Sequence, residues 1–431
     1  MKSINVGLIG AGTVGTGVYK VLRDNKALIR KRRQFNVRVS KIADIAPRRK
    51  RAVKIPSSLF TKDAYKLIND PDIDVIIELV GGTKIAKKFV LDALKAGKHV
   101  VTANKALLAH HGKEIFALAS KKGLGVGFEA SVGGGIPIIK SAMEGYVGNN
   151  IISIHGIMNG TSNYILYRMT EEGLDFNTVL KQAQAEGYAE ADPGFDIDGV
   201  DAAHKLSILV MLSWGKFYNF SDYHVEGIRN INPLDISFAD ELGYKIKLLA
   251  IAKQSREGIE AGVYPALVRK GTQLADVKEA FNAIYVVGDA VGPTMLYGQG
   301  AGMMPTASAV VSDVIEICGN HFNSDSPLVP NLYSEKDNIK LIDPKDTSNM
   351  YYLRFEVVDK PGVLGAITSI LGKYGISIAS MIQKEKRGRS VPIVLMTHEA
   401  KENNLLKALK QIESRKNLTR AKTLFIRVEE V

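Results

Sequence analysis

The sequence predicts an α/β protein in three parts: an N-terminal doubly wound parallel sheet, an α+β middle domain and a C-terminal ferredoxin-like βαββαβ domain. Three observations support this prediction. Short apolar strands alternate with amphipathic helices up to about residue 130. A glycine-rich and less regular stretch follows to about residue 318, and patterns in the order βαββαβ occupy residues 351–430. A chain of 431 residues is also too long for one hydrophobic core.

In the first part, each apolar run is short enough for a strand and is followed by a helical pattern. The strand Ile4–Ile9 leads into a glycine-rich turn and a helix that reaches about Arg30. The other expected strands are Val37–Ala43, Val75–Leu79, His99–Thr102 and one near Val126–Phe128. This repeated strand–helix alternation predicts parallel pairing and helices on both faces of the sheet.

The glycine-rich turn has the sequence Gly10-Ala11-Gly12-Thr13-Val14-Gly15. It closes a strand and opens a helix, which makes a phosphate-binding loop a stronger interpretation than a tight turn without a ligand. Gly10 permits the turn, Gly12 lets a pyrophosphate approach the backbone, and Gly15 lets the helix pack closely. The helix N-terminus then faces the phosphates. The first part is therefore predicted to be a Rossmann-type dinucleotide-binding domain.

The end of the second strand carries signals for two cofactors. Asp44 could accept hydrogen bonds from an adenosine ribose, which favours NAD. The basic residues Arg48, Arg49 and Lys50 could hold a 2′-phosphate, which favours NADP. Both choices stay open, and the basic run favours NADP.

The stretch 183–205 of the middle part combines ionisable groups with a Gly/Pro-rich turn. It contains Glu190, Asp192, Asp201 and Lys205. Asp201 and Lys205 are four residues apart at a predicted helix start, so they share one face. A carboxylate beside a lysine can bind an ammonium group and hold a proton donor. The alternative is a surface ion pair, typically worth about 0.3–0.5 kcal/mol.

The remaining patterns set the expected domain boundaries. GIMNGTSNYIL predicts a strand, a turn and a helix capped near Thr161 or Ser162. A helix up to about residue 318 is expected to return to the first domain, and a polar stretch follows as a linker. The C-terminal part carries no evident catalytic set, so a sensor or dimerisation role is expected. The boundaries are 1–130 with a returning segment at about 298–318, 131–318, 319–349 as the linker, and 350–431.

Composition excludes several classes of protein. The net charge is +12, but no recognition motif or stacking-aromatic pattern accompanies the basic clusters, so no nucleic-acid partner is expected. No apolar stretch reaches the roughly 18 residues of a membrane helix. The single cysteine, Cys318, excludes an internal disulfide and a Cys-rich zinc site. The first residues lead directly into a strand rather than a signal peptide, so a cytoplasmic location is expected.

Several longer motifs together resemble one family. They are GLIGAGTVGTGV at 7–18, ELVGG at 78–82, GKHVVTANKALLA at 97–109, FEASVGGGIPII at 128–139, GIMNGTSNYIL at 156–166, the stretch 183–205, and GQGAGMMPTASAVVSD at 298–313. The chain resembles, over essentially its whole length, the homoserine dehydrogenases of the long, monofunctional type with a C-terminal ACT domain.

The resemblance implies NAD(P)H-dependent, reversible reduction of L-aspartate 4-semialdehyde to L-homoserine in threonine, methionine and isoleucine biosynthesis. It implies Lys205 as the donor of a proton to the substrate oxygen and Lys105 as a clamp or second donor beside nicotinamide and substrate. Glu190 and Asp201 resemble the residues that hold the substrate's ammonium group.

The resemblance also implies further binding sites. A monovalent cation, usually sodium, would be held by Glu129 and the backbone carbonyls of Val132, Gly134 and Ile136. An effector, expected to be threonine, would meet the loop of Asp359, Pro361, Gly362 and Val363. The implied cofactor positions are Gly10, Gly12, Thr13, Val14, Gly15, Asp44, Arg48, Lys105, Gly187 and Gly302. Paired ACT domains imply a homodimer or homotetramer.

Three other interpretations compete with this one. The chain could act on a different small aldehyde, or it could be an inactive cofactor-binding sensor whose input is the C-terminal domain. The retained Glu190, Asp201 and Lys205 weaken both. An aspartate-semialdehyde dehydrogenase needs a cysteine nucleophile, and Cys318 lies in a stretch that reads as linker-like.

Overall fold

The structure is a computed structural model that describes residues 3–322, 339–383 and 391–430. Packing divides the described chain into two compact units. Unit 1 contains residues 3–152, 204–220 and 282–322, and unit 2 contains the others. The chain passes from unit 2 into unit 1 within one helix, α10 (Val200–Trp214).

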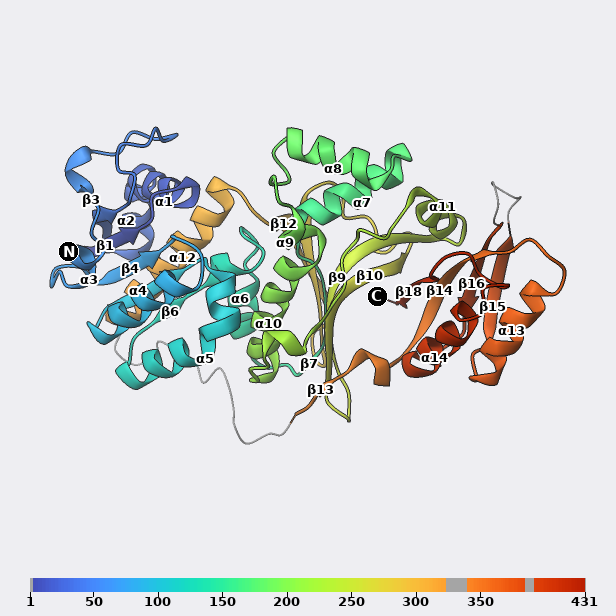
Figure 1. Ribbon diagram of the computed structural model, residues 1–431. Helices are drawn as coiled ribbons and strands as arrows, with labels where there is room; N and C mark the ends of the chain where they lie inside the picture. Colours follow the sequence, from blue (N-terminus) through green and yellow to red (C-terminus); the bar gives the residue numbers. More distant parts are fainter. Residues whose placement is uncertain (1–2, 323–338, 384–390, 431) are drawn as a thin grey trace. The chain divides into compact units, whose positions relative to one another are not determined.

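Unit 1 is built on a parallel sheet with the strand order β3-β2-β1-β4-β5-β6 (Figure 1). Every neighbouring pair in it is parallel, which confirms the predicted doubly wound fold. The strands are β1 (Ser3–Ile9), β2 (Asn36–Ala43), β3 (Phe60–Thr61), β4 (Val75–Glu78), β5 (His99–Thr102) and β6 (Val126–Gly127). Their carboxyl ends lie at one edge of the sheet, where such folds bind ligands.

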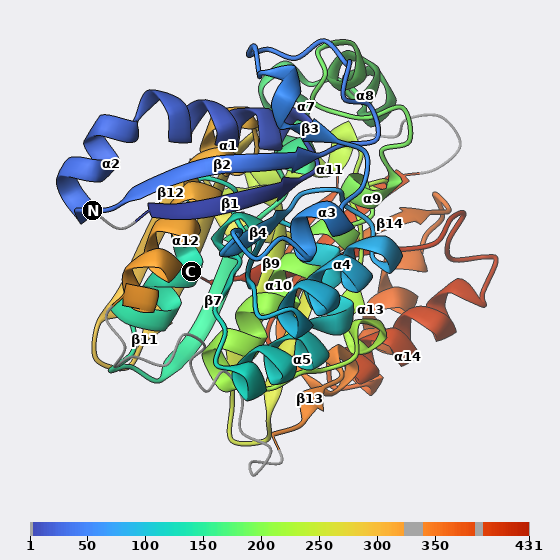
Figure 2. The ribbon, with the colours of Figure 1, turned by 90° about the vertical axis from the view of Figure 1, so that its left-hand side faces the viewer.

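Helices cover both faces of this sheet (Figure 2). They are α1 (Thr13–Asp24), α2 (Lys26–Arg33), α3 (Tyr65–Ile68), α4 (Lys84–Lys95), α5 (Lys105–Lys122) and α12 (Met303–Phe322). The short helix α6 (Ile138–Lys140) also belongs to unit 1. The long helix α12 packs against α1, and apolar residues of both helices share one core with β1. The helix that was expected to run unbroken to about Arg30 is interrupted at Asn25, whose ψ of 13° leaves the helical range.

Two further strands belong mainly to unit 1. They are the neighbours β11 (Phe281–Gly288) and β12 (Gly292–Gln299), and β12 leads into the glycines before α12.

Unit 2 contains a second sheet. Its strands follow the order β9-β10-β18-β14-β16-β15, and Ser153–Gly156 of β7 (Ile151–Ile157) pairs with β9. The other strands are β8 (His224–Val225), β9 (Tyr244–Gln254), β10 (Ile259–Arg269), β13 (Leu341–Ile342), β14 (Ser348–Val357), β15 (Ile378–Gln383), β16 (Val391–Thr397), β17 (Ala400–Lys401) and β18 (Leu424–Glu429). The helices are α7 (Gly160–Glu172), α8 (Phe176–Ala185), α9 (Gly194–Ile197), α11 (Pro233–Glu241), α13 (Val363–Lys373) and α14 (Glu402–Glu413).

The C-terminal elements follow the order β14-α13-β15-β16-α14-β18, which confirms the predicted βαββαβ arrangement. They are called the C-terminal module below. The module is not a separate unit, because β18 pairs in parallel with β10.

Strand β10 pairs along its whole length with β9, and its other edge is covered by three short segments. β13 pairs with residues 259–260, β8 with 262–263 and β18 with 266–268. The described ends of the expected linker are therefore structured: 319–322 lie in α12, and 341–342 form β13. Residues 323–338 lie outside the described residues.

Candidate active site and cofactor loop

The loop between β1 and α1 has the geometry of a phosphate-binding turn. Gly10 has φ of +96°, and a Cβ there would lie 2.7 Å from the carbonyl oxygen of Leu79. A Cβ on Gly15 would lie 2.2 Å from the Gly10 oxygen, so only glycine lets α1 start this close to the loop. Apart from Gly12 itself and its chain neighbours, no atom of the described residues lies within 4 Å of the Gly12 Cβ position. The first turn of α1, which begins with Thr13 and Val14, therefore offers backbone N–H groups with open access.

Asp44 follows β2 and is held by its own loop. Its carboxylate accepts hydrogen bonds from the backbone N–H groups of Ala11 at 2.9 Å and Ala46 at 2.7 Å, and lies 3.1 Å from Arg51. Burial opposes ionisation, but these donors outweigh it and hold the pKa of Asp44 below its usual value. The sequence interpretation missed Arg51, which is held in place by bonds to the Ala11 and Pro47 carbonyls and by the Phe60 ring.

By contrast, the three basic residues that were expected to meet a 2′-phosphate, Arg48, Arg49 and Lys50, are all exposed.

A buried carboxylate organises the carboxyl ends of β4 and β5. Glu78 is fully buried, and it accepts hydrogen bonds from Val80 N at 2.8 Å and from the Thr102 hydroxyl at 2.7 Å. Burial raises the pKa of Glu78. Asn104 donates from its side chain to the Gly82 carbonyl at 2.6 Å and accepts from Leu107 N at 3.0 Å, which caps α5. This capped helix begins with Lys105, at the sheet edge where it was expected.

Lys205 lies in the first turns of α10 and is 8% exposed. The residue before it, His204, contacts two aromatic rings of unit 1. The centroid of its ring lies 5.1 Å from that of His110 on α5 and 4.3 Å from that of Phe220. These contacts pack the helix of Lys105 against the part of α10 that carries Lys205.

Asp201 belongs to unit 2, is 3% exposed, and forms an acidic pair with the half-buried Asp196. The side-chain amide of Asn159 donates to Asp196 at 2.7 Å and to Asp201 at 2.8 Å. Asn159 also caps α7 by accepting from Ser162 N at 2.8 Å, so the expected cap at Thr161 or Ser162 was wrong. Thr161 instead donates to Asp196 at 3.1 Å. The sequence interpretation missed Asn159 and Asp196, although both lie within quoted motifs.

The other predicted ligand-contacting positions are on surfaces and turns. Glu190 is exposed and follows the turn after α8. Gly187, in that turn, has φ of +81°, and no atom of the described chain lies within 4 Å of its Cβ position. Gly302 has φ of +121° and immediately precedes α12. Gly187 belongs to unit 2 and Gly302 to unit 1.

Residues 133–134 form the expected glycine turn, in the left-handed backbone conformation that favours glycine. Gly133 and Gly134 have φ of +69° and +56°, and a Cβ on Gly134 would lie 2.4 Å from the Gly300 oxygen. Glu129 is buried, and its two oxygens accept from Ile139 N at 2.8 Å and Lys140 N at 2.9 Å. Each oxygen keeps a further lone pair, so this carboxylate can still bind a cation. The ligand set that the resemblance implies, this carboxylate with the carbonyls of Val132, Gly134 and Ile136, contains only oxygen atoms, which would suit a hard monovalent ion.

The C-terminal module carries its predicted loop at the start of α13. Gly362 has φ of +84° and precedes Val363, the first residue of that helix. Within the described part of the chain, nothing lies within 4 Å of its Cβ position. Asp359 and Pro361 lie on the same loop.

Cys318 is not in a linker-like stretch, because it lies inside α12 and is fully buried in the core of unit 1. Burial raises the pKa of its thiol to about 12. Such a thiol is a poor nucleophile, which is a stronger argument against a cysteine-dependent dehydrogenase. None of the helices in the described ranges is long and apolar enough to cross a membrane.

Comparisons with known families agree with this geometry. A model of the homoserine dehydrogenase NAD-binding domain matches residues 10–129, and a model of the homoserine dehydrogenase catalytic domain matches residues 137–315. An ACT domain model matches residues 351–417.

Relatives cover the chain almost completely. A homoserine dehydrogenase of Neisseria gonorrhoeae is 46% identical over 96% of both chains, and one of Pseudomonas aeruginosa is 42% identical over the whole of both. The crystal structure of a homoserine dehydrogenase from Thiobacillus denitrificans is 44% identical and superimposes with a TM-score of 0.93 over 100% of this chain and 99% of that one. A structure from S. aureus is 34% identical, with a TM-score of 0.78 over both whole chains.

The phosphate-binding loop and the NAD-binding domain define a nicotinamide-dependent oxidoreductase that acts on a CH–OH group. Within this class, the catalytic domain and the full-length relatives show that the chain belongs to the homoserine dehydrogenase family.

Proposed function

We propose that Lys205 gives the proton in the reversible reduction of L-aspartate 4-semialdehyde to L-homoserine. The supporting observation is its place, nearly buried and one helical turn after the buried Asp201. A bound reduced nicotinamide supplies the hydride. The alkoxide that forms must be protonated as it develops, and an ammonium group beside a carboxylate is suited to this. Lys105, the first residue of α5, is proposed as a second positive group that stabilises the alkoxide.

The acidic groups of unit 2 hold the substrate's ammonium group in this proposal. Asp201 is the main ligand, because Asn159 fixes its carboxylate by a hydrogen bond of 2.8 Å. Glu190 is exposed in the turn after α8. It can therefore act as a second ligand of the ammonium group. Gly187 and Gly302 provide turns that a nicotinamide can approach.

The cofactor is proposed to be NADP rather than NAD. An NAD-type ribose contact needs an accessible carboxylate at the end of β2, and the Asp44 side chain is only 6% exposed and lies against Arg51. The exposed Arg48 is available for a 2′-phosphate.

Three further properties are proposed from the resemblance to the family. Glu129 and the carbonyls of Val132, Gly134 and Ile136 hold a sodium ion that keeps the glycine turn in shape. The loop of Asp359, Pro361, Gly362 and Val363 binds threonine through free N–H groups at the start of α13. The chain forms a homodimer or homotetramer and works in the cytoplasm.

The experiment is the initial rate of oxidation of NADPH and NADH with L-aspartate 4-semialdehyde. The variant Lys205→Met is expected to lower kcat by about 10²- to 10⁴-fold, because it removes the proton donor. Lys122→Met, at the exposed end of α5, is the matched control and is expected to keep the wild-type rate. Full activity of Lys205→Met would rule out its role as donor, and a higher rate with NADH would rule out the NADP preference.

A further inference from the structure

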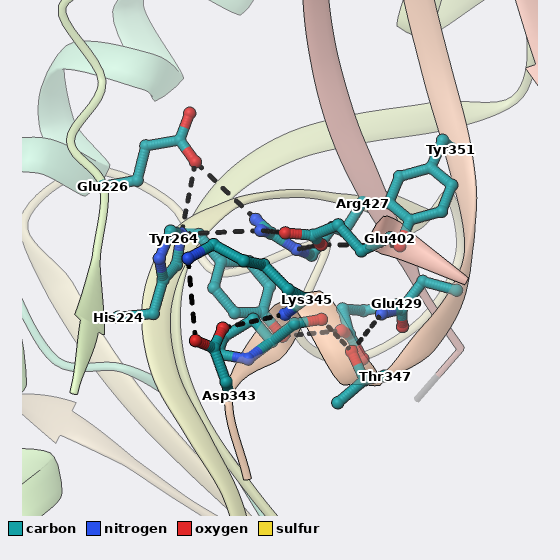
Figure 3. A network of polar contacts seen from close by, with 12 residues as sticks. His224, Glu226, Tyr264, Asp343, Lys345, Thr347, Tyr351, Glu402, Arg427 and Glu429 are labelled. Carbon is teal, nitrogen blue, oxygen red and sulfur yellow. Dashed lines mark hydrogen bonds and ion pairs between the residues drawn. The ribbon is translucent and has the colours of Figure 1, made fainter. Parts of the chain in front are cut away.

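A cluster of buried charges lies where the C-terminal module joins β10, and the proposed reaction does not use it (Figure 3). At its centre is Arg427 of β18, whose side chain is 1% exposed. It donates to the two carboxylate oxygens of Glu402 at 2.7 and 2.8 Å, and it lies 4.3 Å from the centroid of the Tyr264 ring. Glu402 begins α14, so this bidentate pair ties two elements of the module together.

Arg427 also reaches a segment outside the module. One of its nitrogens lies 3.6 Å from the Glu226 carboxylate, and another lies 3.4 Å from His224 Nε2. His224 belongs to β8, which pairs with β10 immediately before the stretch that pairs with β18. The Glu226 side chain is 32% exposed, so this contact is weaker than the buried pair with Glu402 and can change without unfolding the module.

The backbone that follows Glu226 packs tightly on the segment that leads to α10. Ile228 N donates to the Ile197 carbonyl at 2.9 Å. A Cβ on Gly227 would lie 2.2 Å from the same carbonyl oxygen and 2.5 Å from the Asp198 Cα. No side chain fits at residue 227, so a shift of this backbone must shift Ile197 and Asp198 as well.

Asp196 and Asp201 stand at the two ends of that segment, and Asn159 joins their carboxylates. A displacement at Ile197 therefore changes the geometry of the acidic pair. We propose that the Glu226–Arg427 contact positions Asp201 for the substrate's ammonium group and connects the C-terminal module to substrate affinity. Glu226 and Arg427 are positioning residues in this scheme. The inference rests on the proposed function, because it takes Asp201 as the ammonium ligand.

The test is the variant Glu226→Gln, which removes the charge and leaves the Arg427–Glu402 pair intact. L-homoserine oxidation is measured with NADP⁺. We expect the KM for L-homoserine to rise by about three- to tenfold, as is typical for residues that couple two sites. The KM for NADP⁺ and the melting temperature are expected to stay at the wild-type values. The control is Asp240→Asn, which removes an exposed ion pair with Lys270 in the same unit and should change none of these values.

A wild-type KM for L-homoserine in Glu226→Gln would overturn the inference, as would a parallel rise in both KM values with a lower melting temperature. Absence of turnover in the wild-type protein would instead overturn the proposed function. Gly227→Ala provides a second test that changes no charge. Its added methyl group is expected to raise the KM for L-homoserine at least as much, and folded Gly227→Ala protein with a wild-type KM would also overturn the inference.

Discussion

Two asparagines show how single residues place groups that are proposed to act in the reaction. Asn104 caps α5 immediately before Lys105, and Asn159 caps α7 while holding the acidic pair of Asp196 and Asp201. An amide is suited to both places because it has an acceptor for the helix N–H and a donor for a neighbouring oxygen. In each case a helix cap positions a residue that is proposed to contact the substrate, Lys105 or Asp201.

The first prediction concerns the cap of α5. Asn104→Ala is expected to lower the free energy of unfolding by about 1 kcal/mol, because Leu107 N loses its acceptor. It is also expected to lower kcat/KM, because Lys105 is the next residue. Asn104→Ser keeps an acceptor for Leu107 N and should therefore be more stable than Asn104→Ala. It cannot form the bond to the Gly82 carbonyl. Urea titration and steady-state rates measure the two effects, and equal stability of all three proteins would contradict the prediction.

The second prediction concerns a buried lysine on β9. Lys247 is 3% exposed and donates to Asn163 Oδ1 at 3.1 Å and to the Val277 carbonyl. Burial, together with the charge of Lys245, lowers the pKa of Lys247 from 10.5 to about 7. Above pH 7 the unfolded chain therefore binds a proton that the folded chain has lost, so stability rises with pH until about 10.5.

Lys247→Met removes this dependence. Between pH 7 and pH 9, the free energy of unfolding of the wild type is expected to rise by about 2 kcal/mol relative to that of the variant. Lys270→Met, at an exposed lysine paired with Asp240, should keep the wild-type pH dependence. Urea titrations at several pH values give the comparison. Parallel curves for the wild type and Lys247→Met would show that Lys247 is protonated in the fold throughout this range.

At the scale of elements, the sequence predicts strands and turns better than it predicts which polar side chains bond to one another. The strand His99–Thr102 was predicted with the bounds that the structure gives, since its two central valines favour a buried strand. The positive φ of Gly10 follows from its place in the glycine motif. The bond of Glu78 to Thr102 and that of Asp44 to Arg51 could not be predicted in this way. Each joins side chains that only the folded sheet brings together.

The third prediction concerns the contact of α1 with α12. A Cβ on Gly17 would lie 2.7 Å from the Met303 oxygen and 2.9 Å from the Ala307 Cβ. Gly17→Ala is therefore expected to lower the free energy of unfolding by about 1–3 kcal/mol, because two packed helices must separate. Gly365→Ala is the matched control, since Gly365 is exposed on α13 with open space around it. Gly365→Ala should raise the free energy of unfolding by about 0.5–1 kcal/mol. Thermal melting measures both, and stabilisation by Gly17→Ala would contradict the prediction.

At the scale of the whole chain, the C-terminal module is a structural part of unit 2. Sequence reasoning identified its βαββαβ order but expected a separate domain after a linker. β18 pairs with β10, although the paired residues are more than 150 positions apart in the sequence. A local sequence pattern cannot predict such a pairing. Glu429 at the end of β18 then meets Lys253 of β9 and Tyr264 of β10.

The contact of the module with the rest of unit 2 also accounts for a buried carboxylate on α11. Asp235 of α11 is fully buried, and it bonds to Arg354 at 2.5 Å and Tyr352 at 3.1 Å, both from β14. Burial raises the pKa of Asp235 even beside this arginine. Removal of one partner from such a pair typically costs about 3–5 kcal/mol. The stability of α11 therefore depends on the module.

The fourth prediction follows from these two contacts. A chain ended at residue 347 loses the β18 edge of β10 and leaves Asp235 without Arg354. This truncated chain is expected to be largely insoluble or inactive. If the module only regulated the enzyme, the truncated chain would instead stay active and lose only its response to an effector. Pro361→Ala, which alters the proposed effector loop and keeps all these contacts, should retain the wild-type melting temperature and basal kcat. Soluble yield, melting temperature and kcat of the two proteins decide the matter. A truncated chain with wild-type kcat and melting temperature would show that the module only regulates, because neither the β10 edge nor the Asp235 pair would then be needed for folding.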